Sequence, residues 1–228
     1  MKGYIGQYAW LSDGTRPDLA QSRMEFARLQ NKCPKSAFKI MLDSGRYIKG
    51  TRDYGVAYYK GTAFPNELIF YTDAGHNNCP ITNRSIYCFI GFMNGGPIVW
   101  KVKYLEGKPS GSTFEAEQGG AWHAAREIEY LRMLLEEMGF PQKKPTRLYC
   151  DNESAVTYSN TGRLTPRNKN LDLKCSIMKW YSEERIINCL YVNTHTNLAD
   201  IGTKAMTDVD KFRMLRDEML ATATNYSG

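Results

Sequence analysis

The sequence predicts an α/β fold, in which a five-stranded mixed sheet is flanked by helices and preceded by a helical appendage. Three observations lead to this prediction. Strand-like apolar runs occupy residues 68–72, 85–93 and 97–104; a long amphipathic helix follows them; and strand-like runs at 148–150 and 186–192 then alternate with helical segments. From residue 66 the predicted order is strand, strand, strand, helix, strand, helix, helix, strand, helix.

Length and composition are those of a globular protein. A chain of 228 residues with 42% hydrophobic and 24% charged residues can form one large domain, or one domain with an appendage, around a packed core. The longest apolar run, residues 86–93, is too short to span a bilayer, and the first residues lack the apolar core of a signal peptide. We therefore expect an intracellular protein with no membrane partner.

The net charge and the cysteines indicate which partners and metal sites the chain is expected to have. The net charge of +6 is compatible with a polyanionic partner. The six cysteines are scattered, with no Cys-x-x-Cys pair and no histidine at zinc-finger spacing. We expect reduced thiols and no structural zinc site.

The first 60 residues are predicted to be helical. One helix begins at Thr15-Arg16-Pro17-Asp18, where proline suits the first turn, and a second begins near Cys33 and ends near Gly50. Neither helix carries a carboxylate cluster or a glycine-rich phosphate loop. A short β-like run follows at residues 56–59.

The next three apolar runs predict an antiparallel meander. Its last two strands are joined by Asn-Gly-Gly-Pro at residues 94–97, which is typical of a hairpin turn. The first run leads directly into Asp73. This carboxylate is therefore predicted to lie at the end of the first strand of the meander.

A long helix is predicted to begin at Ser112 or Thr113 and to continue through Glu136. Glu117 precedes Ala121 by four residues and so lies on the inward face of this helix, where an unpaired charge is costly to bury. Glu115 lies on a different face and is interpreted as a solvated acid of the first turn. The apolar residues that define the inward stripe are Trp122, Ala125, Ile128, Leu131, Leu135 and Met138.

The C-terminal third contains two more acids in comparable places. Asp151 follows the strand at 148–150 and precedes a helix over residues 153–159, and Asp200 follows the strand at 186–192. Ligand sites in α/β sheets lie where strands end, although aspartate is also a common helix N-cap. A helix over residues 171–184 and a final charged helix over 208–220 complete the prediction.

Four acids, Asp73, Glu117, Asp151 and Asp200, are thus expected at one edge of the sheet. Each alone is explained at least as well by a structural role. Four carboxylates together would raise one another's pKa values unless a cation held them. Hard divalent cations prefer carboxylate oxygens, and a pair of Mg²⁺ ions can activate water for phosphodiester hydrolysis.

Seven sequence strings, in order along nearly the whole chain, carry a resemblance to a known family. They are TRPD (15–18), RYIKGT (46–51), YTDA (71–74), GGPIVWK (95–101), EAE (115–117), YCDNESA (149–155) and LADIGTK (198–204). Together they resemble the ribonuclease H fold, and more narrowly the ribonuclease H domain at the C-terminus of copia-type retrotransposon Pol polyproteins. By this resemblance, residues 1–60 are a helical lead-in similar to the end of a reverse transcriptase (thumb or connection), and residues 61–228 are a ribonuclease H-like domain.

The resemblance implies an endonuclease that cuts the RNA strand of RNA–DNA hybrids with two Mg²⁺ ions, or with Mn²⁺ in their place. The family's four catalytic and metal-binding acids fall on Asp73, Glu117, Asp151 and Asp200, with Glu115 as the fallback for Glu117. The implied partners are the hybrid and a polymerase domain upstream in a polyprotein. The implied location is the cytoplasm, in virus-like particles, with the nucleus as a second compartment. No polymerase aspartate pair is present, so this chain is not expected to copy nucleic acid.

The chain departs from the family pattern at two places. Gly75-His76-Asn77 stands where the family usually has a tryptophan, and Gly119-Gly120 follows Glu117 in a helix that each glycine weakens by about 1 kcal/mol. Two alternatives therefore stay open: a catalytically decayed or domesticated nucleic-acid-binding domain of the same fold, and a structure-specific DNA nuclease. His195 is interpreted as a surface-loop residue, with a role in product release as the alternative, and His76 and His123 as incidental.

Five basic residues are candidates for binding the substrate. They lie on the edge of the meander and in the loop after the short helix: Lys101, Lys103, Arg163, Arg167 and Lys169. Each is explained equally well as part of a solvated face. An RNA–DNA hybrid would be recognised by its backbone shape and 2′-hydroxyl groups, so little sequence preference is expected.

Overall fold

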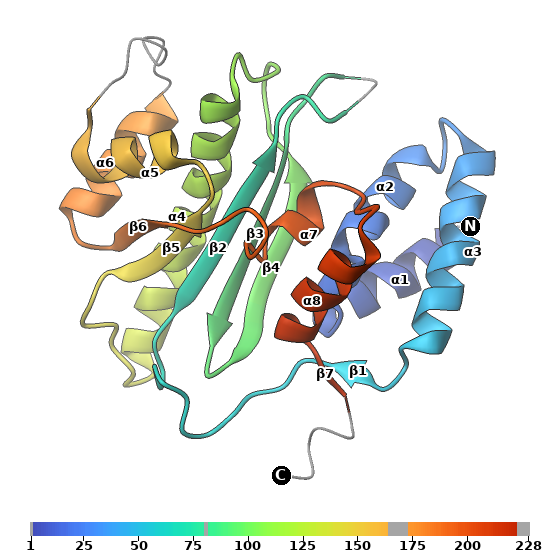
Figure 1. Cartoon of the computed structure of the whole chain (residues 1–228), viewed down its shortest axis with the longest axis horizontal. Coiled ribbons are helices and arrows are strands. Elements are labelled where there is room, and N and C mark those ends of the chain that lie inside the picture. Colours follow the sequence, from blue (N-terminus) through green and yellow to red (C-terminus); the bar gives the residue numbers. More distant parts are fainter. Residues whose placement is uncertain (1, 80–81, 164–172, 223–228) are drawn as a thin grey trace.

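The computed structural model describes residues 2–79, 82–163 and 173–222, and its centre is a five-stranded mixed sheet (Figure 1). The strand order is β4-β3-β2-β5-β6, with β2 antiparallel to β3, β3 antiparallel to β4, and the pairs β2–β5 and β5–β6 parallel. The strands are β2 (Ile69–Gly75), β3 (Ile86–Met93), β4 (Gly96–Tyr104), β5 (Thr146–Cys150) and β6 (Ile187–Tyr191). The predicted mixed sheet, with its meander and its parallel strands, is confirmed.

Helices cover both faces of this sheet. On one face α4 (Thr113–Glu137) packs on β2 and β3, with α5 (Glu153–Thr161) and α6 (Leu173–Glu183) over the parallel strands. On the other face α7 (Asp200–Thr203), α8 (Val209–Met219) and α2 (Ala20–Leu29) contribute to a second apolar cluster against β3 and β4. No helix within the described ranges is both long enough and apolar enough to cross a membrane.

Helix α4 lies very close to the sheet at its N-terminal half. A Cβ atom on Gly120 would be 3.2 Å from Cβ of Tyr87 and 3.5 Å from the backbone oxygen of Asp73. The glycine therefore permits the close approach that brings the start of this helix to β2 and β3. Glycine lowers the stability of a helix, and here this loss is explained by the close packing that a larger residue would prevent.

The predicted inward stripe of α4 is correct over most of its length. Ile128 and Leu135 are buried in the main core, and Trp122 and Leu131 pack against it from its edge. The prediction that Met138 belongs to the inward stripe is wrong. Its side chain is 60% exposed, because α4 ends at Glu137 and Met138 no longer faces the sheet.

The N-terminal helices have a small apolar core of their own. Tyr8 of α1 (Lys2–Gly14), Phe26 of α2 and Ala37 of α3 (Pro34–Gly50) are buried together with Leu19, the last residue of the short 3₁₀ segment Pro17–Leu19. At its edge the Arg16 guanidinium donates two hydrogen bonds to the Asp18 carboxylate, at 2.9 and 2.7 Å. Both residues are buried, so this pair is shielded from water.

The β-like run predicted at residues 56–59 is wrong. The structure has a two-residue strand just before it, β1 (Tyr54–Gly55), which pairs antiparallel with β7 (Ala221–Thr222) near the C-terminus. Residues 56–59 have strand-forming side chains and lie beside the β3–β4 turn, where the Tyr59 N–H donates to the Asn94 backbone oxygen at 2.9 Å, but this contact is not extended into a strand.

Candidate active site

Asp73 lies on β2, and Asp151 comes directly after β5, the parallel strand beside it. Tyr71 of β2 is in register with Tyr149 of β5, and each acid is two residues further along its strand direction. Neighbouring strands are about 4.8 Å apart. Asp73 lies within β2, which continues to Gly75, and not at the strand's end as predicted, whereas Asp151 directly follows β5.

Glu117 approaches these two acids from α4. Its side chain is only 4% exposed, because it lies on the sheet side of the helix as predicted. The Cys150 thiol donates to its Oε2 atom at 3.7 Å, and the backbone N–H of Ala74 donates a second hydrogen bond. Ligand atoms of Glu117, Cys150 and Asp151 all lie within 4.8 Å of one another.

Asp200 begins α7 on the opposite side of β2 and is 1% exposed. It forms ion pairs with Lys204, at 2.5 Å, and with Lys211 of α8. In the same short helix the Thr203 hydroxyl donates to Oδ2 of Asp73. A Cβ atom on Gly202 would be 2.4 Å from Sγ of Cys88, so glycine allows α7 to sit directly on β3.

The four acids influence one another electrostatically. Burial raises the pKa of Asp73 to about 7, and the negative charges of Asp151 and Asp200 act in the same direction. Burial, followed by the charges of Asp73 and Asp151, raises the pKa of Glu117 well above its usual value. The fold thus holds carboxylates where their ionised forms are unfavourable, an arrangement common at functional sites.

The donor set fits a hard divalent cation. Carboxylate oxygens are the ligands that Mg²⁺ prefers, and two of the acids here are buried with incomplete charge compensation. Burial raises the pKa of the Cys150 thiol, so this sulfur stays protonated at neutral pH and serves as a hydrogen-bond donor. Asp73, Glu117, Asp151 and Asp200 are the residues that would hold the ion.

Comparison with known proteins finds relatives among retrovirus-related Pol polyproteins. The chain is 27% identical over 213 residues to a retrovirus-related Pol polyprotein from transposon TNT 1-94 of Nicotiana tabacum, an alignment that covers 93% of this chain and 16% of the polyprotein. It is 26% identical over 208 residues to that of transposon RE2 of Arabidopsis thaliana, covering 91% and 14%. The chain is a homologue of these Pol polyproteins.

The match to these Pol polyproteins covers almost the whole chain but only a small part of their length. No protein-family profile matches the chain. A secreted RxLR effector protein of Plasmopara viticola is 30% identical over 135 residues, or 54% of this chain and 89% of that protein. A crystal structure of LC11-RNase H1 in complex with RNA/DNA hybrid is 17% identical and covers 59% of this chain and 91% of its own, with a TM-score of 0.43.

The predicted nucleic-acid-binding residues are only partly described. Lys101 and Lys103 are exposed on β4, and their registry opposite Phe89 and Tyr87 places them on the α4 side of the sheet. Arg163 is exposed after the end of α5. Arg167 and Lys169 lie outside the described residues.

The other predicted polar residues have local partners. The Glu115 carboxylate accepts a hydrogen bond from the backbone of Gly111, while the backbone N–H of Glu115 donates to the N-cap residue Ser112. This is a capping arrangement at the start of α4. His195 is exposed, and its backbone N–H donates to the Asn193 side chain.

Four partners of the acids were not predicted from the sequence: Lys204, Lys211, Thr203 and Cys150. Lys204 follows Asp200 by four residues, a spacing at which helical side chains meet, and this was the available signal. Lys211 and Cys150 reach their partners from other elements, so no local pattern identifies them.

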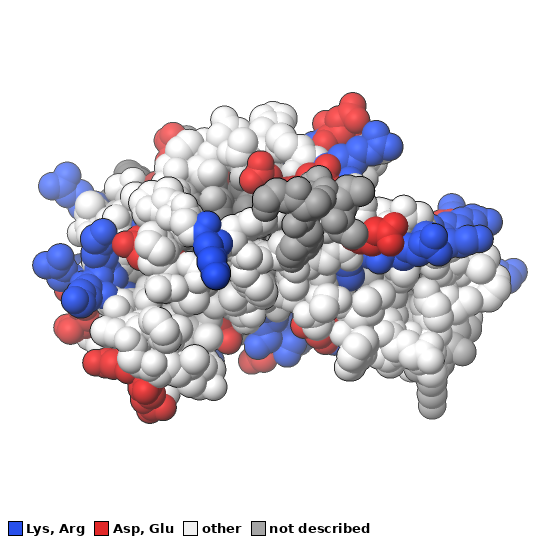
Figure 2. Space-filling view, turned by 90° about the horizontal axis from the view of Figure 1, so that it is seen from below, with Lys and Arg blue, Asp and Glu red and all other residues white. Residues whose placement is uncertain are grey.

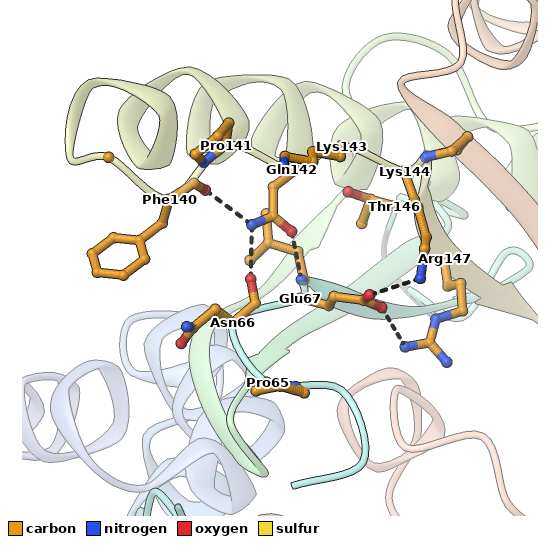
Figure 3. A pocket seen from close by; sticks show the side chains of 13 residues that line it. Pro65, Asn66, Glu67, Phe140, Pro141, Gln142, Lys143, Lys144, Thr146 and Arg147 are labelled. Atoms are coloured by element: carbon orange, nitrogen blue, oxygen red, sulfur yellow. Dashed lines mark hydrogen bonds and ion pairs between the residues drawn. The ribbon is translucent and has the colours of Figure 1, made fainter. Parts of the chain in front are cut away.

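Figure 3 shows a cavity of about 490 Å³. Its lining includes the residues before β2 and the first residues of β5, whereas Asp151 follows the last residue of β5. The walls of the cavity are the loop before β2 and the segment between α4 and β5, linked by Gln142, which bonds to the backbone of Asn66 and Leu68. Two of its three basic residues, Lys144 and Arg147, pair with Glu67, while Lys143 has no ion pair among the described residues. The charges of Lys144 and Arg147 are satisfied within the chain, and the cavity is no part of the acidic site.

We expect the stability of the metal-free protein to fall as the pH rises from about 4 to 7. The Asp73 carboxyl has a pKa of about 7 in the folded chain and of about 3.9 in an unfolded chain, so the folded state binds more protons in this window. The free energy of unfolding should fall by up to about 4 kcal/mol from this group. Thermal unfolding in EDTA at pH 5 to 8 measures the effect.

Divalent ions should reverse this loss. Mg²⁺ binds the ionised carboxylates, so it should raise the melting temperature at pH 8 and change it little at pH 5. The Asp73→Asn variant is the control, because it should show a flatter pH dependence. A melting temperature in EDTA that increases from pH 5 to pH 8 would contradict the expected sign.

Replacing Gly202 with Ala should destabilise the protein by about 1–3 kcal/mol. The added methyl group meets Cys88 and Val102, both buried, so α7 must move away from the sheet and take Asp200 and Thr203 with it. Gly6→Ala in α1 is the matched control: nothing lies within 4 Å of its added Cβ, and it should gain up to about 1 kcal/mol in helix propensity. Urea unfolding measures the free energy of unfolding of both variants. An unchanged free energy for Gly202→Ala would contradict the packing argument.

Proposed function

We propose that the chain is a ribonuclease H that hydrolyses the RNA strand of RNA–DNA hybrids, with two Mg²⁺ ions, or Mn²⁺, bound by Asp73, Glu117, Asp151 and Asp200. The observation that carries the proposal is the buried carboxylate of Glu117, held on the sheet side of α4 beside Asp73 and Asp151. A helix does not place an acid there for stability, because burying such a charge is costly. Homology to retrovirus-related Pol polyproteins supports a role in reverse transcription.

The protein's own groups would orient the carboxylates. Thr203 fixes one oxygen of Asp73, and the Ala74 backbone N–H and the Cys150 thiol fix Glu117. Bound divalent ions would supply an activated water and stabilise the leaving oxygen. Preorganised acids of this kind need little rearrangement when the ions and the scissile phosphate arrive.

The relatives suggest the wider setting of this activity. We propose that residues 1–60 lead in from a polymerase domain upstream in a polyprotein, that residues 61–228 form the nuclease domain, and that the protein acts inside the cell, in cytoplasmic particles and in the nucleus. The Pol relatives are six to seven times longer than the segment matched here, which leaves room for further domains in those proteins.

A cleavage assay tests the activity directly. An end-labelled RNA–DNA hybrid is incubated with the protein in Mg²⁺, in Mn²⁺ and in EDTA, beside DNA duplex, RNA duplex and a DNA junction of equal length. Cleavage of the RNA strand only, and only with a divalent ion, is the expected result. Cutting of the junction in preference to the hybrid would instead identify a structure-specific DNA nuclease, and no cutting in any metal would refute nuclease activity.

The second candidate is a nucleic-acid-binding domain of the same fold without catalysis. One observation favours it: Asp200 is already neutralised by Lys204 and Lys211 within the chain. An acid that is satisfied in this way does not require a metal ion. Hybrid binding without any cleavage would support this candidate over the first.

A further inference from the structure

Four basic side chains gather on the side of the sheet that α4 covers. Lys101 and Lys103 come from β4, Arg126 from α4 and Lys174 from α6. They surround His123 of α4, whose pKa burial lowers to about 4, and the charges of all four act on it in the same direction. His123 is therefore neutral at physiological pH, and the four cations lie around one uncharged ring.

A row of aromatic rings supports two of these cations, Arg126 and Lys174. The rings of Tyr87 and His123 are stacked with centroids 4.3 Å apart and an interplanar angle of 2°, and Trp122 meets His123 edge-on at 4.7 Å. The Arg126 guanidinium carbon and the Lys174 Nζ atom each lie 5.0 Å from the centroid of Trp122. We name this surface, made of Tyr87, Trp122, His123 and the four cations, the α4 basic surface.

The cations of the α4 basic surface have no carboxylate partner. Eleven other basic side chains in the described ranges pair with an acid, among them Arg23, Arg28, Arg46 and Lys179, and further ones are unpaired at scattered positions. On the face in Figure 2, seen from below, acidic side chains lie among the basic ones. In the α4 basic surface four cations act on one ring, and no described carboxylate lies within 4 Å of any of them.

Three acids nearby reduce the positive charge without cancelling it. Burial, with the charges of Glu106 and Glu127, raises the pKa of Tyr87 to about 12, so both acids act on this ring. Glu129 accepts a hydrogen bond from Tyr181, whose hydroxyl Arg126 also influences. Four cations against three acids leave a net positive surface. Like charges held close together without partners repel one another, and a polyanion removes that cost.

We propose that the α4 basic surface binds the sugar–phosphate backbone of a nucleic acid, as a second contact outside the four acids. Lysine and arginine side chains that neutralise phosphates give affinity without base recognition. The rigid support matters as well, because side chains held on a tryptophan lose less conformational freedom on binding. Among polyanions, a nucleic acid presents phosphates in series along its backbone, so cations from three neighbouring elements can each meet one.

The surface lies within reach of the same duplex as the acids. His123 and Arg126 follow Glu117 by six and nine residues on one helix, which corresponds to about 9–14 Å along its axis. This offset equals about three to four base pairs at 3.4 Å each. In this respect the inference rests on the proposed function, since it assigns the bound strand to the hybrid that the acids would cut.

Binding without catalysis separates the two proposals. Affinity for a fluorescein-labelled hybrid is measured by anisotropy in EDTA, from 50 to 200 mM salt, for the wild type and for Arg126→Gln/Lys174→Gln. The double variant should bind about tenfold more weakly at 100 mM salt, and its salt slope should be shallower by about 2, one for each lost phosphate contact. DNA duplex should lose affinity equally, because phosphates are common to both.

Two further double variants serve as a charge control and as a second test of the surface. Arg46→Gln/Lys49→Gln removes the same charge from exposed positions of α3 and should change affinity by less than about twofold, since only long-range charge is lost. Lys101→Gln/Lys103→Gln, at exposed positions of β4, repeats the test without touching Trp122, should Arg126→Gln/Lys174→Gln unfold.

Each outcome of these binding measurements either supports or overturns the inference. Unchanged affinity in both surface variants, an equal loss in the α3 control, or no hybrid binding by the wild type overturns the inference, whether or not Mg²⁺ supports cleavage. Loss of affinity in the surface variants of a protein that never cleaves would uphold the inference and reject the nuclease.

Discussion

Replacing Asp151 with Asn should abolish the proposed hybrid cleavage, with an expected loss of about a thousandfold or more, while the protein remains folded. The substitution removes one negative charge and one metal-binding oxygen, and a bound divalent ion stabilises the transition state by several kcal/mol, or about a thousandfold in rate. Asp151 is partly exposed and the neighbouring Asn152 caps α5, so the fold does not depend on the Asp151 carboxylate. Initial cleavage rates in Mg²⁺ and the circular dichroism spectrum are the two measurements.

Glu153→Gln is the matched control for Asp151→Asn. Glu153 is an exposed acid two residues further along, in the first turn of α5, and its loss changes the net charge equally. Cleavage by this variant should stay within about twofold of the wild type, since an exposed charge is screened by salt. Undiminished turnover by Asp151→Asn would refute the assignment of the site.

Arg16→Met should destabilise the protein by about 3–5 kcal/mol, because it leaves a buried carboxylate without its cation. Arg16 holds Asp18 through two hydrogen bonds and also donates to the backbone oxygen and the side chain of Thr51. The Tyr47 hydroxyl donates to the same carboxylate at 2.7 Å. Loss of the guanidinium therefore disturbs the contacts between the start of α2 and the end of α3, and equilibrium unfolding in urea measures the cost.

Two comparisons give the Arg16→Met result its meaning. Arg16→Met/Asp18→Leu removes both charges and should recover much of the lost stability. Arg23→Met breaks an exposed pair with Asp13 and should cost less than about 1 kcal/mol. A loss for Arg16→Met as small as that for Arg23→Met would contradict the buried-pair argument.

Much of the fold could be predicted because its strongest signals are local. The hairpin at residues 94–97 requires two residues with positive φ, and Asn94 and Gly95 provide them at 52° and 81°. Glu117 could be placed on the sheet side because its phase follows the buried residues Ala121 and Ala124. Such features depend on spacing along one element, which a sequence states directly.

The errors arise where a distant partner decides. Residues 56–59 have strand-forming side chains, yet the short strand forms at Tyr54–Gly55, where β7 supplies its ladder. Met138 continues the apolar spacing of α4, but the helix ends one residue before it. The partners of the acids and the α4 basic surface join residues up to 130 positions apart, and no local pattern in a single sequence contains such contacts.

The pairing of β1 with β7 ties residue 54 to residue 222, so the chain between them is a closed loop whose two ends leave at the same place. Tension applied between the helices α1–α3 and the C-terminus would load this two-residue pairing together with the contacts of α2 on β4 and α7. Proteolysis or truncation that removes residues 221–222 would therefore remove the strand partner of Tyr54–Gly55. The change would loosen the chain just after α3, at a distance from the strand that carries Asp73.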